Sequence, residues 1–183
     1  MRITAGKHRS RVLKSLEGDN TRPTTDKVKE AVFSKMGPYF DGGCILDLFG
    51  GSGAISLEAI SRGFDRAVII EKNKSACNII KENIRLLKED EKTELWNCSY
   101  LSALDRLADQ KFDLIYADPP YGYQLGSEII REVCERDLIK NDGYLVLETS
   151  KEEKIDVCPG MRIEKDATYG VTKVTYVRKE NTE

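Results

Sequence analysis

The sequence predicts an α/β fold with an open, doubly wound and largely parallel sheet. From residue 44 onward, short apolar runs rich in β-branched residues alternate with segments of helical periodicity. This alternation is typical of βαβ units, in which neighbouring strands are parallel. The rhythm changes after residue 160, where two strand-like runs follow each other across Gly170. Such a pair predicts a terminal antiparallel hairpin.

The predicted elements follow one another with short connections. Strands are expected at residues 44–48, 67–71, 93–96, 112–117 and 144–148, with the hairpin strands at 161–166 and 171–177. Helices are expected at residues 53–62, 74–88, 101–107 and 126–136. Before the sheet, residues 2–14 predict a small hairpin that turns at Gly6-Lys7-His8, and Thr25 is expected to cap a helix over residues 26–36.

Length and composition indicate one domain of a globular protein. The 183 residues, 40% hydrophobic and 33% charged, suit a single domain (residues 1–183), with a basic N-terminal extension (1–40) before the core (41–183). No apolar run approaches the roughly 18 residues that span a membrane, and the start lacks a signal sequence, so a cytoplasmic protein is expected. One histidine and five scattered cysteines predict reduced thiols and no metal site.

Positive charge is concentrated near the N-terminus. Residues 1–35 hold nine basic side chains and four acids, a local balance of +5, whereas the whole chain has a net charge of −2. A basic segment on an acidic body predicts a nucleic-acid partner. The candidate RNA-binding residues are Arg2, Lys7, Arg9, Arg11 and Arg22. The alternative is a solvated strand pair whose charges only keep it soluble.

Two acidic positions follow the first two strands. Asp47-Leu-Phe-Gly-Gly-Ser-Gly53 follows the first, and its glycines let the backbone approach a ligand closely at a helix N-terminus. The dinucleotide spacing Gly-x-Gly-x-x-Gly is absent. A carboxylate beside this turn suits an amino group better than a phosphate, and Glu71 can accept hydrogen bonds from ribose hydroxyls. Together they indicate an amino-acid-bearing nucleoside, although each alone also occurs in an ordinary tight turn.

The segment Ala117-Asp-Pro-Pro-Tyr-Gly122 follows the strand expected at 112–117. Two consecutive prolines remove two backbone donors and fix two φ angles, which makes a rigid rim at the strand end. Such a rim is also what a sharp turn out of the sheet would need. Its position beside two other acidic strand ends favours a functional role.

These motifs resemble those of a known enzyme family. Asp47-Leu-Phe-Gly-Gly-Ser-Gly, Glu71 and Asp118-Pro-Pro-Tyr121 are similar to the cofactor-binding and amino-methylating motifs of seven-stranded S-adenosylmethionine-dependent methyltransferases. The stretch Arg22-Pro-Thr-Thr-Asp-Lys-Val-Lys-Glu-Ala-Val-Phe33 resembles more specifically the RsmD-type enzymes, which methylate N2 of a guanine in 16S ribosomal RNA. The likeness spans nearly the whole chain, but Asp-Pro-Pro-Tyr is shared with DNA adenine and protein glutamine methyltransferases.

The resemblance implies residues for each role. The implied catalytic residues are Asp118, Pro119, Pro120 and Tyr121; the implied cofactor-binding residues are Asp47, Phe49, Gly50, Gly51, Gly53, Glu71, Ser99 and Asp118. By its own pattern Phe49 is a packing residue. The segment Asn97-Cys98-Ser99 stands where many such enzymes have an acid for the adenine amine, so Ser99 or backbone groups are expected to serve there.

The implied reaction explains the rigid rim that the two prolines form after the strand at 112–117. A conjugated exocyclic amine is a poor nucleophile, and Asp118 with the carbonyl of Pro119 can accept its hydrogens while the prolines fix the geometry. Tyr121 can stack on an extruded base. The implied partner is 16S RNA in a small ribosomal subunit, partly or fully assembled. The alternatives are a DNA adenine-N6 methyltransferase and a catalytically inactive RNA-binding module.

Overall fold

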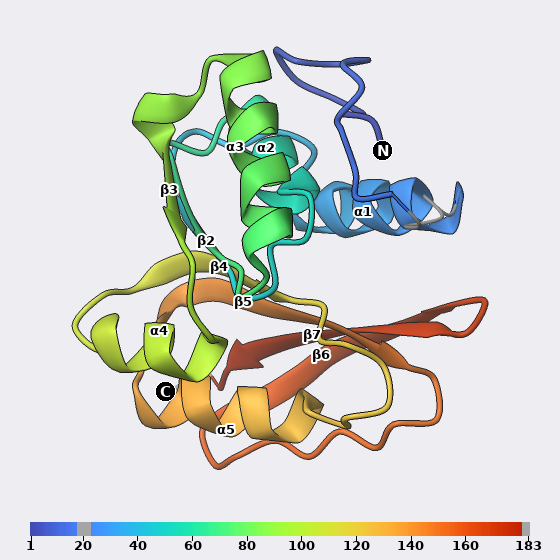
Figure 1. The fold of residues 1–183 in the computed structure, drawn as a ribbon. Coiled ribbons are helices and arrows are strands. Elements are labelled where there is room, and N and C mark those ends of the chain that lie inside the picture. Colours follow the sequence, from blue (N-terminus) through green and yellow to red (C-terminus); the bar gives the residue numbers. More distant parts are fainter. Residues whose placement is uncertain (18–22, 181–183) are drawn as a thin grey trace.

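A computed structural model of the chain describes residues 1–17 and 23–180. Within them a seven-stranded sheet carries helices on both faces (Figure 1), so the predicted α/β fold is confirmed. The strands are β1 (Cys44–Asp47), β2 (Arg66–Ile70), β3 (Thr93–Trp96), β4 (Phe112–Ala117), β5 (Ile139–Ser150), β6 (Met161–Tyr169) and β7 (Thr172–Lys179). The α-helices are α1 (Pro23–Met36), α2 (Ala54–Ser61), α3 (Lys74–Leu87), α4 (Tyr100–Arg106) and α5 (Gly126–Glu135), with a 3-10 turn at Asp90–Lys92.

The strand order is β3-β2-β1-β4-β5-β7-β6. The first five strands are parallel, whereas β7 runs antiparallel to both β5 and β6. From β1 the sheet extends to one side through β2 and β3 and to the other side through β4 and β5, so the topological switch point lies between β1 and β4, where Asp47 lies opposite Tyr116. In an open α/β sheet, this switch point is where a ligand crevice forms beyond the carboxyl ends of the strands.

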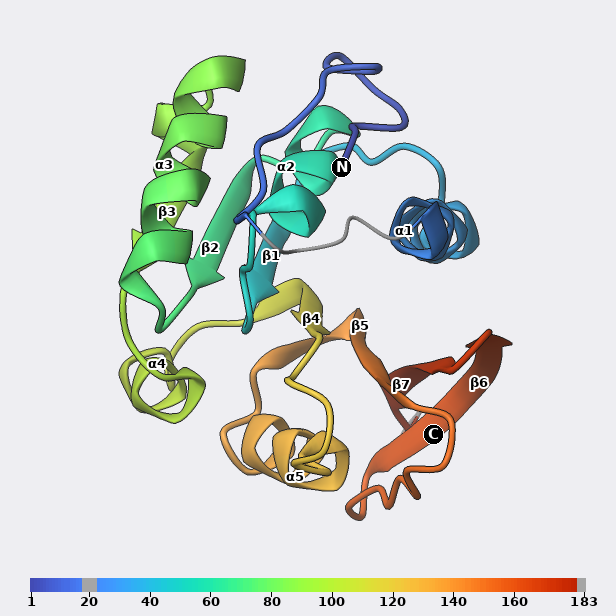
Figure 2. The same ribbon diagram turned by 45° about the vertical axis from the view of Figure 1, so that its right-hand side comes forward.

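Two apolar layers hold the helices on the sheet. Helices α1, α2 and α3 pack on one face through residues such as Phe33, Leu57 and Ile80, and α4 and α5 pack on the other through residues such as Leu104 and Ile130. Figure 2 shows these two groups on opposite sides of the strands. The central strands are therefore buried on both faces, as their continuous apolar sequences require.

The turn after β1 needs glycine at two places. Gly53 has a φ of 81°, and it is the residue immediately before α2. A Cβ on Gly50 would lie 2.6 Å from Ile69 Cγ2, which is closer than real contacts allow. The glycines thus let the chain turn sharply over β2 and enter α2.

The N-terminal segment forms the predicted hairpin, but its paired part is shorter than expected. The antiparallel bridge between Arg2 and Val12 and the hydrogen bond from the amide of Ile3 to the carbonyl of Arg11 (2.9 Å) join its two sides, and residues 5–10 form turns. The physical reason is that α2 takes the backbone donors that a cross-strand partner would need. The Glu58 carboxylate accepts hydrogen bonds from the amides of Thr4 (3.0 Å) and Ala5 (3.2 Å).

Other boundaries also differ from the sequence prediction. Helix α1 begins at Pro23, so Thr25 lies inside its first turn and is not its cap; proline is favoured at a first helical position. Strand β5 is longer than expected because its first residue, Ile139, pairs with Phe112 before a register shift. The strands β6 and β7 form the predicted terminal hairpin, with an irregularity between Ile163 and Lys165.

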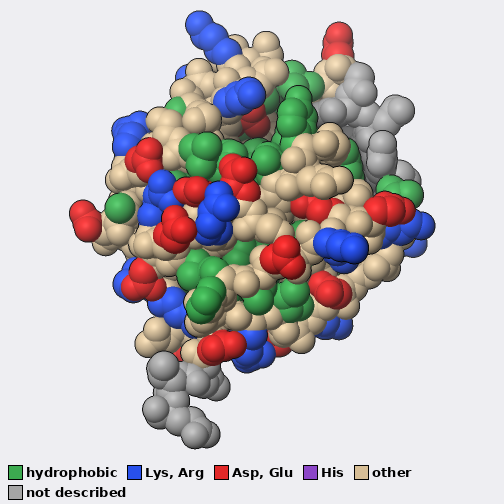
Figure 3. All heavy atoms as spheres, turned by 90° about the horizontal axis from the view of Figure 1, so that it is seen from below, with side chains coloured by type: hydrophobic (Ala, Val, Ile, Leu, Met, Phe, Trp, Pro, Cys, Tyr) green, Lys and Arg blue, Asp and Glu red, His purple; other side chains and the backbone are tan. Residues whose placement is uncertain are grey.

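In the described part of the chain, no helix is both long and apolar enough to cross a membrane. The surface that carries α4 and α5, seen from below in Figure 3, mixes acidic and basic side chains around small apolar areas.

Candidate active site

Asp47 lies at the carboxyl end of β1 and is almost fully buried, with 1% of its surface exposed. Its carboxylate accepts hydrogen bonds from Ser56 Oγ (3.1 Å) on α2 and from the amide of Phe49 (3.3 Å). Burial raises the pKa of Asp47 to about 7, although the two hydrogen bonds lower it. The negative charges of the nearby Asp118 and Glu71 add to the rise. A buried carboxyl without a cation partner is poised to receive a cationic group.

The glycine turn and Glu71 form one unit. Glu71 follows β2, and its Oε2 accepts the amide of Gly51 at 2.9 Å while Oε1 accepts the amide of Asn73 at 2.7 Å. A Cβ on Gly51 would have nothing within 4 Å, so the turn is open above this residue. A carboxylate has about four acceptor positions, so Glu71 keeps free positions for ribose hydroxyls. These residues fit an amino-acid-bearing nucleoside.

The Asp-Pro-Pro-Tyr segment leaves the sheet at the end of β4, as predicted. Pro119 is buried, whereas Pro120 and Tyr121 are exposed. The Tyr121 hydroxyl lies 2.7 Å from Thr172 Oγ1 at the start of β7, so the tyrosine is tied to the terminal hairpin. With 52% of its surface exposed, the Tyr121 side chain is accessible to a planar group.

Asp118 stands beside a carboxyl that the sequence analysis missed. Since Ala117 lies opposite Leu147 in the parallel register, the next residues, Asp118 and Glu148, are neighbours at the carboxyl ends of β4 and β5. Desolvation and the Glu148 carboxylate raise the pKa of Asp118 well above its usual range, although solvent reaches its side chain.

The site is therefore strongly acidic. Asp47 is the last residue of β1, Glu71 and Asp118 follow β2 and β4, and Glu148 lies near the end of β5. None of these four acids forms an ion pair within residues 1–17 and 23–180. Glu148 had a signal in the sequence: like Asp118, it ends an apolar strand run, Leu145-Val-Leu147. Among these described residues, no group of three His, Cys, Asp or Glu side chains is arranged to hold a metal ion.

Aromatic side chains border the glycine turn. The rings of Phe49 and Tyr100 pack with centroids 5.2 Å apart, so Phe49 combines the predicted packing role with a place beside the turn. Ser99 is exposed at the N-terminus of α4, where its hydroxyl accepts the amide of Ser102 at 3.2 Å. Asn97 donates to the carbonyl of Glu71 at 2.9 Å. Ser99 thus serves α4 as a cap and lies in the segment that follows β3.

The basic N-terminal residues are mostly engaged within the protein. Lys7 pairs with Glu89, Arg11 Nη2 donates to the carbonyl of Leu86 at 3.2 Å, and Lys14 pairs with Glu82 at 2.6 Å. Arg2 and Arg9 are exposed. Arg22 lies outside the described residues.

Lys7 does not lie at the carboxyl ends of the strands. Its partners Ser61 and Glu89 are at or beyond the C-terminal ends of α2 and α3, whereas both helices begin at the glycine-turn edge. Lys14 lies closer to that edge, because its amide donates to Asn83 (2.8 Å) and the Asn83 side chain also donates to the carbonyl of Ser52 (2.9 Å) in the turn.

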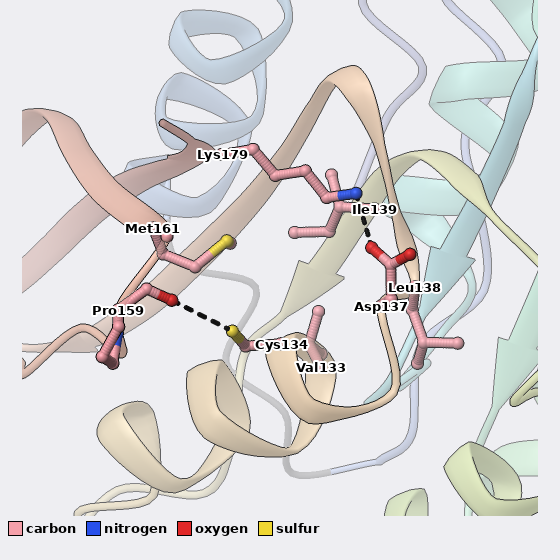
Figure 4. A pocket seen from close by; sticks show the side chains of 9 residues that line it. Val133, Cys134, Asp137, Leu138, Ile139, Pro159, Met161 and Lys179 are labelled. Carbon is pink, nitrogen blue, oxygen red and sulfur yellow. Dashed lines mark hydrogen bonds and ion pairs between the residues drawn. The ribbon is translucent and has the colours of Figure 1, made fainter. Parts of the chain in front are cut away.

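A cavity of about 140 Å³ lies away from this site, between the end of α5 and the strands β6 and β7 (Figure 4). Val133, Cys134 and Met161 contribute apolar atoms to it, and Lys179 at its edge pairs with Asp137. Strand β7 runs antiparallel to β5, so Lys179 marks the amino-end edge of the sheet. The cavity therefore does not belong to the acidic site formed by Asp47, Glu71, Asp118 and Glu148.

Comparisons with known proteins agree with this arrangement. Residues 1–178 match the family described as Conserved hypothetical protein 95. YlbH of Bacillus subtilis is 36% identical over 98% of this chain and 99% of its own length. The ribosomal RNA small subunit methyltransferase D of Haemophilus influenzae is 34% identical over 93% of this chain and 90% of its own. The solved structure of yhhF from Escherichia coli has a TM-score of 0.87 at 26% identity and covers 100% of this chain and 99% of its own. The chain belongs to the Conserved hypothetical protein 95 family, which is the family of RsmD-type methyltransferases.

Proposed function

We propose that this protein transfers a methyl group from S-adenosylmethionine to the exocyclic N2 amine of a guanine in 16S RNA of the small ribosomal subunit. The observation that carries the proposal is the position of Asp118-Pro-Pro-Tyr121 at the end of β4, next to the turn after β1 and to Asp47. This position supports a site at the switch point of the sheet in which amine acceptors lie beside the cofactor. The family membership supports the reaction, and the names of its relatives support ribosomal RNA as the substrate.

The residues divide into two groups by role. Asp47 receives the cationic amino group of the cofactor, Glu71 accepts its ribose hydroxyls, and the backbone of Gly50, Gly51 and Gly53 lets the ligand approach closely. When bound, the cofactor supplies an electrophilic methyl group on a positively charged sulfur. The acidic residues of the site favour the positively charged cofactor over the product, whose sulfur is neutral.

The second group handles the base. Asp118 and the carbonyl of Pro119 accept the amine hydrogens and direct the nitrogen lone pair toward the methyl group. Pro120 keeps this rim rigid, and Tyr121 stacks on the extruded base, which returns roughly 1 to 3 kcal/mol of the cost of unstacking. Ser99 and the Phe49–Tyr100 pair are proposed neighbours of the adenine ring.

The RNA is held by a different part of the protein. Arg2, Lys7, Arg9, Arg11 and Arg22 are proposed to contact phosphates. Lys7 lies at the C-terminal ends of α2 and α3, away from the glycine turn, and this placement suits a folded RNA or a ribosomal particle better than a short single strand. The cationic side chains already paired with acids, such as Lys7, must exchange those partners for phosphates.

A methyl-transfer assay tests the proposal. Small subunits from cells that lack the gene are incubated with radiolabelled S-adenosylmethionine and the purified protein, and the labelled nucleoside is identified after digestion. We expect N2-methylguanosine with the wild type and with the control Glu152→Gln, which changes an exposed acid in the segment after β5 that has no proposed role. Asp118→Asn should abolish labelling. A labelled nucleoside other than N2-methylguanosine, or no transfer despite cofactor binding, would overturn the proposal.

A further inference from the structure

Glu148 and Tyr116 form a buried pair behind Asp118 that the roles above do not use. Glu148 is 7% exposed near the end of β5, and Tyr116 is 1% exposed in β4. Tyr116 pairs with Val146, so strand alternation places Tyr116, Asp118 and Glu148 on the same face of the sheet. This is the face covered by α1, α2 and α3.

The Tyr116 hydroxyl is buried and makes no hydrogen bond of normal geometry to any residue that the structure describes. Leaving such a group unpaired is costly, so its retention needs a reason. The register places Tyr116 and Asp118 beside Glu148, and these two polar groups oppose the rise in the pKa of Glu148 that burial causes. The hydroxyl is thus held beside two carboxyls that stand next to each other.

The other ionisable groups around this pair do not neutralise it. Asp47 of β1 and Tyr176 of β7 are near, and neither is a cation. Lys29 of α1 is buried but donates to Asp26 (3.3 Å) and lies 3.3 Å from Glu58. Desolvation raises the pKa of both Glu148 and Asp118. Two adjacent carboxyls in this setting are expected to hold one proton between them.

We propose that Glu148 is a positioning residue that shares one proton with Asp118 and takes up that proton when Asp118 accepts a proton from the methylated amine. The inference rests on the proposed methyl transfer. As the amine nitrogen forms its bond to the methyl carbon, the carbon–sulfur bond breaks and its electron pair stays on sulfur. The nitrogen, now cationic, releases one proton to an Asp118 oxygen, and the proton already on Asp118 moves to Glu148.

The pair is then uncharged, and Asp118 can return one proton to water because solvent reaches it. In the proposed cycle the Tyr116 hydroxyl, which is unpaired among the described residues, turns to donate to Glu148 when that carboxyl is ionised and so keeps it turned toward Asp118. A purely structural Glu148 would keep the strand ends packed, but it would not link the rate of methyl transfer to a shared proton.

The first test needs no methyl acceptor. Calorimetry of S-adenosylmethionine binding is done at pH 7.5 in phosphate and in Tris, whose different ionisation enthalpies reveal the protons released per cofactor bound. S-adenosylhomocysteine, which lacks the positive sulfur, is the comparison ligand. Both ligands carry the amino group that Asp47 receives, so we expect wild type to release more protons with S-adenosylmethionine than with S-adenosylhomocysteine. In the isosteric Glu148→Gln this difference should fall to about half or less, with cofactor affinity within about threefold of wild type.

The second test follows single-turnover methyl transfer between pH 5.5 and 9. Glu148→Gln should lower the rate by about 10- to 100-fold, as expected for losing assistance in proton transfer, and should change the pH profile while the KM for RNA stays unchanged. Tyr116→Phe should show a smaller change of the same kind. If thermal denaturation shows that Glu148→Gln is unfolded, Tyr116→Phe takes its place in the test. The control Glu152→Gln should match wild type.

The two sets of results separate the inference from the proposed function. Wild-type rates, wild-type pH profiles and unchanged proton release in both Glu148→Gln and Tyr116→Phe would overturn the shared-proton role. Failure of the wild type to methylate any RNA, with the Glu148-dependent proton release intact, would instead overturn the proposed substrate and leave the proton sharing standing.

Discussion

Replacing Asp47 with asparagine should change how the stability of the protein depends on pH. Burial raises the pKa of Asp47 from 3.8 to about 7, so the folded state holds this proton more tightly than the unfolded state. The stability that the proton provides is therefore complete below about pH 4 and falls as the pH rises to about 7. At about 1.4 kcal/mol per pKa unit, the ionised carboxylate costs about 4 kcal/mol above this window.

The measurement compares two pH values within that range. Urea unfolding, followed by the fluorescence of the single tryptophan, Trp96, gives the free energy of unfolding at pH 5 and pH 8. Relative to Asp47→Asn, wild type should lose about 2 to 3 kcal/mol between these values. The control Asp41→Asn, at an exposed position, should keep the wild-type dependence. An equal difference between wild type and Asp47→Asn at both pH values would refute the role assigned to burial.

Four further changes test other parts of the site and the fold. Glu71→Ala should weaken S-adenosylmethionine binding by about 1.5 to 3 kcal/mol in calorimetry, and an unchanged affinity would contradict the ribose contact. Tyr121→Ala should lower turnover with cofactor binding nearly intact, and Tyr121→Phe should recover most of the activity if stacking is its role. Arg9→Ala with Arg11→Ala should flatten the slope of log affinity for RNA against log salt by roughly 1 to 1.5, whereas an unchanged slope would move the RNA surface elsewhere. Glu58→Gln should cost about 3 to 5 kcal/mol in denaturant unfolding, because two buried cations lose their partner, and a loss below 1 kcal/mol would show that the N-terminal segment does not depend on it.

The strand ends were predictable because their signals are local. Asp47 and Asp118 each follow an apolar run that only a buried strand explains, and parallel strands bring their carboxyl ends to one edge. The resemblance to a methyltransferase family then gave these positions their roles. Both steps depend on short segments of sequence and on a sheet topology that the alternation of elements predicts.

The N-terminal segment was predicted less well because distant residues shape it. Glu58, more than 50 positions away, takes the amides of Thr4 and Ala5, and Lys7 finds its partner in Glu89. Nothing near residue 6 signals these contacts. Glu148 was missed for a related reason: its importance depends on β5 lying directly beside β4, and the sequence order of the strands alone does not establish that neighbour.

The central claim is that this chain methylates N2 of one guanine in small-subunit RNA through Asp118. Its most direct test is mass mapping of modified nucleosides in 16S RNA from cells that lack the gene, complemented with wild type or with Asp118→Asn. We predict that one N2-methylguanosine is lost on deletion, returns with wild type, and stays absent with Asp118→Asn although the variant is folded and expressed. An unchanged set of modified nucleosides after deletion, or full restoration by Asp118→Asn, would contradict the claim.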